Sequence, residues 1–442
     1  MLFRSASNTA SNAAANAASS VSVNGSANTS VNAAANNTSN GTANNSTTTS
    51  TAGSSVAASA ASGLSIAQKN LIQAKYQPYF DSVYSTYASS FDAMVASGNG
   101  RRYYDMSYVH AAHLNMYEAT ADRKYLERSL SWMETQIGLA NNSDAAGRRN
   151  WSADPNDGET RFGATIVPYL LYDLQSTIEF ARLARLVLTT AALKTSYGNR
   201  AQAIYDFVRI NIVDKWLVDR KSIEDTAAYW STNADPVKNR TYWIDDRTMM
   251  AARILMDLDK VTPSPRYSAL YTTLLNGMKA RLVSWSPPGP AGTVTWDQKR
   301  VGFELGFISA PDTAHGNRHV LTMIEAYRNG VVFSKSDVQG LGKLFAGVMW
   351  NKSVSDPLIT NFVDGSNAGY RTYPPYGNGA IYFGWEQLGA WEPQVQSLCD
   401  AVLDAIIAGR SNPTVAYNAS EFGRLGLAAS LARNLLVTAQ GL

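Results

Sequence analysis

The stretch Tyr117-Glu-Ala-Thr-Ala-Asp122-Arg-Lys-Tyr125-Leu-Glu-Arg-Ser-Leu130 contains a short turn between two helical patterns. One helix is predicted from about Tyr104, the turn spans Glu118 to Asp122, and a second helix runs from Lys124 to Ile137. Helices joined by so short a turn lie side by side and antiparallel, which makes the stretch an αα-hairpin.

Paired helical patterns recur along the rest of the chain. The predicted pairs are Phe162–Leu188 with Asn199–Val213, Trp243–Leu258 with Arg266–Leu282, Asn317–Tyr327 with Ser336–Met349, and Ile381–Ile407 with Glu421–Val437. Strand signals are confined to two short pieces, Thr293–Trp296 and Val301–Leu305. The sequence therefore predicts an all-α fold of helical hairpins with a few short strands in loops.

The N-terminal segment differs in composition from everything that follows it. It contains no charged residue after Arg4 and no aromatic residue after Phe3, and Ala, Asn, Ser and Thr dominate up to Gly63. Such a segment has too little apolar surface to offset the loss of chain entropy on folding. We predict that residues 1–63 are a tether, or an arm that an assembly partner orders, and that residues 64–442 are the helical domain.

The overall charge and cysteine content exclude several classes of protein. A formal net charge of +3 gives no reason to expect nucleic acid, although it is compatible with an acidic polymer as ligand. The single cysteine, Cys399, excludes an intrachain disulfide and a cysteine-rich metal site. We recognise no membrane-spanning run and no secretory signal, and we expect no cofactor.

Two histidines and an arginine lie close together near the start of the helix predicted between Asp312 and Gly330. Asp312 is a predicted N-cap and Gly330 a predicted C′ residue of one helix. On a helical wheel His315, Arg318 and His319 share an arc, well away from the apolar arc of the same helix. We therefore predict that both histidines lie off the core.

All four histidines of the chain fall into two short clusters, His315 with His319 and His110 with His113. Both clusters lie near the beginnings of helical patterns, as a cleft built from helix ends requires. The alternative is that the rings cap helices or pack in the core. Either pair has helical spacing suited to a metal, but no His-Glu-x-x-His motif exists, and we predict no catalytic metal.

The turn from Tyr117 to Leu130 resembles the repeated hairpin turn in the (α/α) toroids of carbohydrate-active enzymes. In those enzymes an apolar helix ends in a Thr-Gly-Asp-like turn before a Lys-Tyr-Leu start. The resemblance implies that residues 64–442 form an (α/α) toroid or incomplete barrel that acts on a carbohydrate.

Toroidal polysaccharide lyases use an asparagine, a histidine, an arginine and a tyrosine, and similar residues occur here in two places. β-Elimination across a uronate needs a neutralised carboxylate, a base for the C5 proton and an acid for the leaving oxygen. The resemblance implies His315 or His319 as base and Tyr370 or Tyr373 as acid or alternative base. The predicted substrate-binding residues are Asn317, Arg318, Asn361, Arg371, His110, His113, Trp243, Trp385 and Asp245.

A second resemblance points to hydrolysis. Trp243-Ile-Asp245-Asp246-Arg-Thr-Met249 resembles the Trp-x-Asp-Asp-x-x-Met stretch of toroidal unsaturated-uronyl hydrolases, which implies Asp245 or Asp246 as acid/base. The second carboxylate of such a hydrolase would be Asp312, Asp364 or Glu159. The alternative for aspartates at a helix start is capping.

The leading expectation is a lyase that depolymerises an acidic, uronate-containing polysaccharide. The alternatives are a toroidal glycoside hydrolase and a non-enzymatic glycan-binding protein of a cell surface or virion. An extracellular or virion-associated location is expected, because an uncharged arm without a secretory signal would suit a phage depolymerase.

Overall fold

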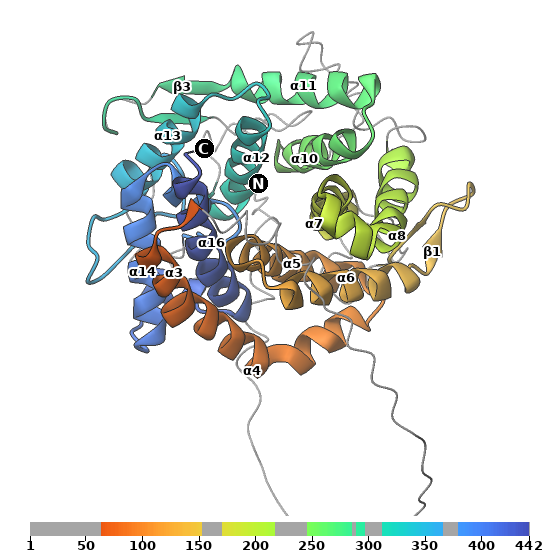
Figure 1. The fold of residues 1–442 in the computed structure, drawn as a ribbon. Coiled ribbons are helices and arrows are strands. Elements are labelled where there is room, and N and C mark those ends of the chain that lie inside the picture. Colours follow the sequence, from red (N-terminus) through yellow and green to blue (C-terminus); the bar gives the residue numbers. More distant parts are fainter. Residues whose placement is uncertain are drawn as a thin grey trace, which may run out of the picture.

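The computed structural model describes residues 63–152, 170–216, 245–284, 289–296, 312–365 and 379–441, with Leu170, Asp245 and Asp246 described by their backbone alone. The predicted arm and the predicted strand Val301–Leu305 lie outside these residues. The fold is all-α and of the toroid type, as predicted, with an inner and an outer set of helices (Figure 1).

The inner set is α5 (Gly100–Thr120), α7 (Leu170–Thr189), α10 (Asp245–Val261), α12 (Thr313–Arg328) and α16 (Glu421–Ala439). The outer set is α4 (Gln77–Val95), α6 (Arg123–Gly138), α8 (Ala191–Phe207), α11 (Pro265–Lys279), α13 (Lys335–Leu344) and α14 (Pro393–Ile407). Shorter helical pieces are α3 (Ile66–Leu71), η2 (Ile72–Tyr76), η4 (Val208–Val213), η6 (Phe345–Met349), η7 (Trp385–Ala390) and α15 (Pro413–Asn418). The strands are β1 (Asn142–Ser143), β2 (Arg149–Asn150), β3 (Leu282–Ser284) and β4 (Val294–Trp296).

The predicted hairpin turn joins α5 to α6. Ala121 adopts the left-handed region at φ 57°, which ends α5, and the Asp122 side chain accepts a hydrogen bond from the Lys124 amide at 3.1 Å to begin α6. The hairpin prediction is confirmed, because both ends of the turn are fixed by local hydrogen bonds.

Two predicted helices are shorter in the structure. The helix predicted to reach Leu282 ends at Lys279, and Leu282–Ser284 instead pairs antiparallel with Val294–Trp296. The helix predicted from Ile381 is interrupted between Ala390, where the 3₁₀ helix η7 ends, and Pro393, where α14 begins. Proline has no amide hydrogen with which to continue a preceding helix, but it is well suited to the first position of a new one.

The inner helices run parallel to one another. Between α5 and α7, Gln175 donates to Ser107 at 2.6 Å and Arg182 donates to Asn115 at 2.7 Å, so residue numbers rise together in the two helices. The helices α16 and α5 are parallel in the same way. The ring centres of Phe422 and Tyr108 lie 6.1 Å apart, and Ser430 Oγ accepts a hydrogen bond from Asn115 at 3.1 Å. The N-termini of these helices therefore share one end of the toroid.

Towards the opposite end, buried and partly buried charges from the middle and C-terminal parts of the inner helices contact one another. We call this set the basal network, and its members are Glu118, Glu179, Arg182, Arg185, Arg253, Asp257, Glu325, Arg328 and Arg433. A single residue of α16, Arg433, contacts both Glu118 of α5 at 2.5 Å and Glu325 of α12 at 3.1 Å. Burial opposes ionisation, yet the neighbouring arginines lower the pKa of both carboxyl groups. The network thus joins helices far apart in the chain around the toroid axis.

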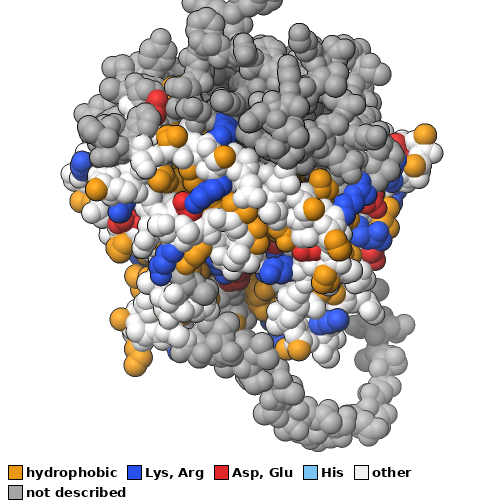
Figure 2. Space-filling view, turned by 90° about the horizontal axis from the view of Figure 1, so that it is seen from above, with side chains coloured by type: hydrophobic (Ala, Val, Ile, Leu, Met, Phe, Trp, Pro, Cys, Tyr) orange, Lys and Arg blue, Asp and Glu red, His pale blue; other side chains and the backbone are white. Residues whose placement is uncertain are grey.

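One face of the described part of the chain carries mixed charge. In Figure 2 lysine and arginine side chains lie beside aspartate and glutamate side chains, and the described atoms of that face form no patch of one sign. Within the described ranges, no helix combines the length and apolarity needed to cross a membrane.

Candidate functional site

The first turn of α12 holds an aspartate–histidine pair. Asp312 is the N-cap, and one of its oxygens accepts from the His315 amide at 2.8 Å while the other lies 2.6 Å from His315 Nδ1. Gly330, at φ 70°, follows the other end of the helix, where the Val331 amide bonds to the Ala326 carbonyl at 2.9 Å. Both predicted ends of this helix are confirmed.

The pair is accessible and its carboxyl group is ionised. The His315 and Asp312 side chains are 37% and 39% exposed. Partial burial raises the pKa of Asp312, but His315 outweighs it by its charge and hydrogen bonds, and the pKa falls to about 2. An ionised Asp312 favours the tautomer in which His315 Nδ1 carries the proton and Nε2 the lone pair. Such a pairing suits a general base.

Arg318 lies about one turn further along α12 and is held by neutral groups of two other inner helices. Its Nε donates to Gln175 Oε1 at 2.9 Å, and its Nη2 donates to the hydroxyl groups of Tyr104 and, at 3.4 Å, Tyr108. The guanidinium carbon also lies 5.4 Å from the centre of the Tyr104 ring. These contacts fix the plane of the guanidinium group.

Tyr417 of α15 completes what we call the site cluster, namely Tyr104, Tyr108, Asp312, His315, Arg318 and Tyr417. Burial and the nearby charge of Asp312 raise the pKa of Tyr417 to about 12, and burial raises the pKa of Tyr108 well above its ordinary value. Both hydroxyl groups are therefore protonated at neutral pH and can donate hydrogen bonds.

Asn361 lies beside the same helix start. Its carbonyl oxygen accepts from the Thr313 amide at 2.7 Å, and the next residue, Phe362, forms a β-bridge with Asp312. The structure thus brings together three of the predicted site residues, His315, Arg318 and Asn361.

His319 differs from His315 although the two lie on one arc of the helix. Its ring is fully buried, tilted by 34° over Trp296 at 5.4 Å between ring centres, and its Nδ1 lies 3.2 Å from the His315 carbonyl oxygen. The prediction that both histidines lie off the core is wrong for His319, because β4 covers that face of an inner helix. A buried ring is not placed to act as a base on a polymer.

Asn317 and Trp385 are packing residues in the structure. The Asn317 amide donates to the Ala380 carbonyl at 3.0 Å and accepts from the Trp385 amide at 3.2 Å. The Trp385 indole is fully buried between Phe345 and Trp296 and donates to the Thr313 carbonyl at 2.9 Å. Since the indole has no exposed face and the contacts of Asn317 fix η7 against α12, the prediction that these two residues bind substrate is wrong.

His110 and His113 are core residues, which corrects their prediction as substrate-binding groups. His110 Nε2 lies 2.9 Å from Gln136 Oε1, and the His113 ring packs edge-on against Phe80 and Trp132. Complete burial lowers the pKa of His110 to about 4 and that of His113 to about 3. These rings face the outer layer, whereas Tyr104 and Tyr108 of the same helix face α12.

The remaining predicted residues are not placed by the structure. Tyr370, Arg371, Tyr373 and Trp243 lie outside the described residues, and so do the side chains of Asp245 and Asp246. The backbone of this aspartate pair begins α10, at the same end of the toroid as the site cluster. Across the described part of the chain, no group of three or more His, Cys, Asp or Glu side chains is arranged to hold a metal ion.

Sequence reasoning missed Tyr104, Tyr108, Gln175 and Tyr417. Tyr104 and Tyr108 occupy the first turns of α5, as His315 does in α12, so proximity to a helix start was the available signal. The parallel inner helices direct their positive dipole ends towards this end of the toroid, which favours an anionic ligand.

Comparison with known proteins adds little to this geometry. No protein-family model matches the chain, and no curated protein matches it. A solved structure named as a polysaccharide lyase is 13% identical, with a TM-score of 0.46 over 83% of this chain and 99% of that one.

Proposed function

We propose that this protein depolymerises a uronate-containing polysaccharide by β-elimination, with His315 as the base and Arg318 as a carboxylate-binding group. The observation that carries the proposal is the partly exposed Asp312–His315 pair, with the buried Arg318 about one turn further along the same helix and tyrosines beside it.

Each requirement of the reaction has a candidate in the site cluster. A planar guanidinium group matches a carboxylate and disperses the negative charge that develops when the C5 proton leaves. His315, held in one tautomer by Asp312, accepts that proton. Tyr104 or Tyr417 supplies a proton to the leaving oxygen, while Tyr370 and Tyr373 stay predictions for the same role.

The contacts of Asp312 suit elimination better than hydrolysis. A hydrolase with Asp245 or Asp246 as acid needs an ionised carboxylate that reaches the sugar or a water molecule, whereas both oxygens of Asp312 are bonded to His315. Asp312 therefore suits the orientation of His315 better than the base or nucleophile role beside Asp245 or Asp246.

The test is to incubate the protein with a panel of polyuronates and follow the ultraviolet absorbance of the unsaturated product. His315→Gln should lower kcat by about 10²- to 10⁴-fold, the range expected when a general base is removed. Lys335→Gln, an exposed position on the outer helix α13, is the control and should leave kcat unchanged.

Two other outcomes would overturn the proposal in different ways. Release of reducing ends without ultraviolet absorbance would identify a hydrolase. Saturable binding of the polymer with neither product would identify a glycan-binding protein.

A further inference from the structure

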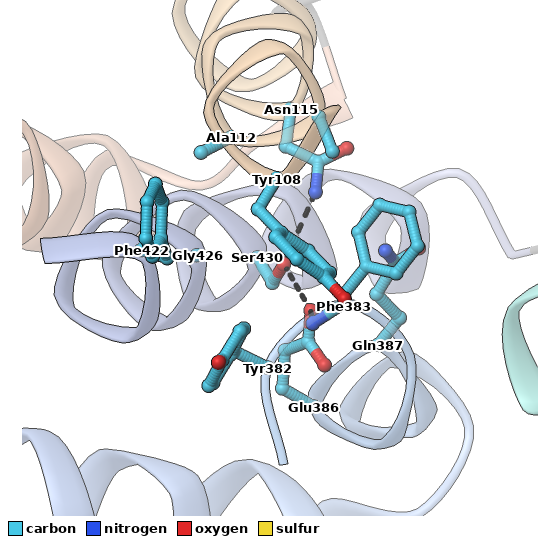
Figure 3. A pocket seen from close by; sticks show the side chains of 11 residues that line it. Tyr108, Ala112, Asn115, Tyr382, Phe383, Glu386, Gln387, Phe422, Gly426 and Ser430 are labelled. Carbon is cyan, nitrogen blue, oxygen red and sulfur yellow. Dashed lines mark hydrogen bonds between the residues drawn. The ribbon is translucent and has the colours of Figure 1, made fainter. Parts of the chain in front are cut away.

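Tyr108 of the site cluster lines a small pocket of about 10 Å³, close to the least volume that holds one water molecule. Its wall includes Tyr108 of α5, Phe383 and Glu386 near the start of η7, and Ser430 of α16 (Figure 3). The pocket is thus shared by Tyr108 and a buried carboxyl group that the proposed reaction does not use.

Glu386 is only 1% exposed, and its hydrogen-bond partners are backbone amides and a hydroxyl group. One carboxylate oxygen accepts from the Phe383 amide and from Ser430 Oγ, both at 2.9 Å, and the other accepts from the Gly384 amide at 2.7 Å. Burial raises the pKa of Glu386 to about 7. Burying an acidic group costs free energy unless hydrogen bonds replace its hydration, and here three donors from the turn and from α16 do so.

The hydrogen bonds of Glu386 stabilise a turn in which Phe383 has an unfavourable backbone conformation. Phe383 has φ 82°, a region that residues other than glycine rarely adopt. Gly384 lies so close to Asn317 of α12 that a Cβ atom would collide with the Asn317 carbonyl oxygen. The turn is therefore pressed against the helix that carries His315 and Arg318.

The turn reaches the site cluster through two rings. The Phe383 ring meets the Tyr108 ring edge-on, with 4.8 Å between centres and 84° between planes. The Tyr108 hydroxyl in turn accepts a hydrogen bond from Arg318 at 3.4 Å. Figure 3 shows the Phe383 and Tyr108 rings side by side above the Glu386 carboxylate.

We propose that Glu386 is a positioning residue, which orients the Arg318 guanidinium group through the Phe383–Gly384 turn and Tyr108. The proposal rests on the proposed function only in assigning the substrate carboxylate to Arg318. Because Glu386 is buried, we expect its own carboxylate to make no contact with the substrate.

The first experiment compares crystal structures of the wild type and Glu386→Gln. A glutamine has one acceptor oxygen instead of two, so the amide of Phe383 or Gly384 loses its partner. We expect the turn to leave its left-handed conformation, the Tyr108 ring to shift, and Arg318 to lose its contact with Tyr108. An unchanged Arg318–Tyr108 contact would overturn the proposal, whatever the protein catalyses.

Two further variants keep this experiment decisive. Glu134→Gln, at a half-exposed ion pair on outer helix α6, is the matched control and should leave the site cluster unmoved. If Glu386→Gln does not fold, Ser430→Ala removes one hydrogen bond of the same carboxylate, and a smaller shift of Tyr108 in the same direction is expected.

The second experiment is a double-mutant cycle on kcat/KM with Glu386→Gln and Arg318→Lys. In the wild-type background Glu386→Gln should lower kcat/KM by about 10-fold, and in the Arg318→Lys background it should have almost no effect. Independent, multiplying effects would show that Glu386 does not act through Arg318. Absence of turnover on every polyuronate would refute the proposed function alone, because the crystal structures would still decide the role of Glu386.

Discussion

Arg433 and Asp312 lie at opposite ends of the parallel inner helices, and their charges are used differently. The Arg433 side chain is 1% exposed and contacts the carboxylates of Glu118 and Glu325, which are 16% and 6% exposed, whereas the Asp312–His315 pair is more than one-third exposed. Buried, mutually bonded charges hold helices together, while an exposed pair can meet a ligand. The comparison teaches that burial, rather than residue type, separates the arginines of the basal network from the Asp312–His315 pair, although Arg318 beside that pair is only 5% exposed.

The largest expected effect is at the basal network. Arg433→Met leaves Glu118 and Glu325 buried with one partner fewer, which should lower the free energy of unfolding by about 3–5 kcal/mol. Urea denaturation measures the change, and kcat of the folded variant should stay near the wild-type value. Arg200→Met removes a surface pair with Glu134 and should change the free energy of unfolding by about 1 kcal/mol or less. An equal loss of unfolding free energy in Arg433→Met and Arg200→Met would contradict the contrast between the basal network and a surface ion pair.

Arg318→Lys tests the other end of the toroid. Because an ammonium group lacks the planar fork of arginine, kcat/KM on a polyuronate should fall by about 10²- to 10³-fold, the range for loss of one charge-stabilising donor. The free energy of unfolding should change far less than in Arg433→Met. Arg200→Lys, on the outer surface, is the matched control and should retain full activity.

Acid should weaken the Asp312–His315 pair over a defined range. The pKa of Asp312 falls from its ordinary value of 3.8 to about 2 in the folded protein, so the pair stabilises the fold above about pH 4. That contribution is lost as the pH falls from about 4 to about 2. Asp312→Asn should therefore flatten the pH dependence of the unfolding free energy over this range, and an unaltered slope would show that the pair adds no stability.

The smallest effect expected is that of salt. Raising the ionic strength to about 0.5 M shortens the screening length to below about 10 Å, so KM for a charged polymer should rise a few-fold. The buried basal network is screened much less, and the unfolding free energy should change little. A KM that is independent of salt would argue against an acidic polymer as substrate.

Local hydrogen bonds explain which parts of the fold could be predicted. Asp122 and Ala121 define the α5–α6 hairpin within a few residues, and Asp312 and Gly330 bound α12 in the same way. Such ends depend on groups close in sequence, so the sequence reveals them. The stop of α11 at Lys279 was missed because it depends on pairing with β4, more than ten residues further on.

The sequence by itself determined the all-α class, the hairpins, and the presence of a histidine and an arginine at the start of α12. Only the tertiary structure decided that His315 is exposed while His319 lies against Trp296, and that His110 and His113 are core residues. It also decided that Tyr104 meets Arg318, although 214 residues separate them in the chain. The physical reason is that burial and long-range contacts depend on which helix becomes the neighbour of which, and no local pattern encodes that choice.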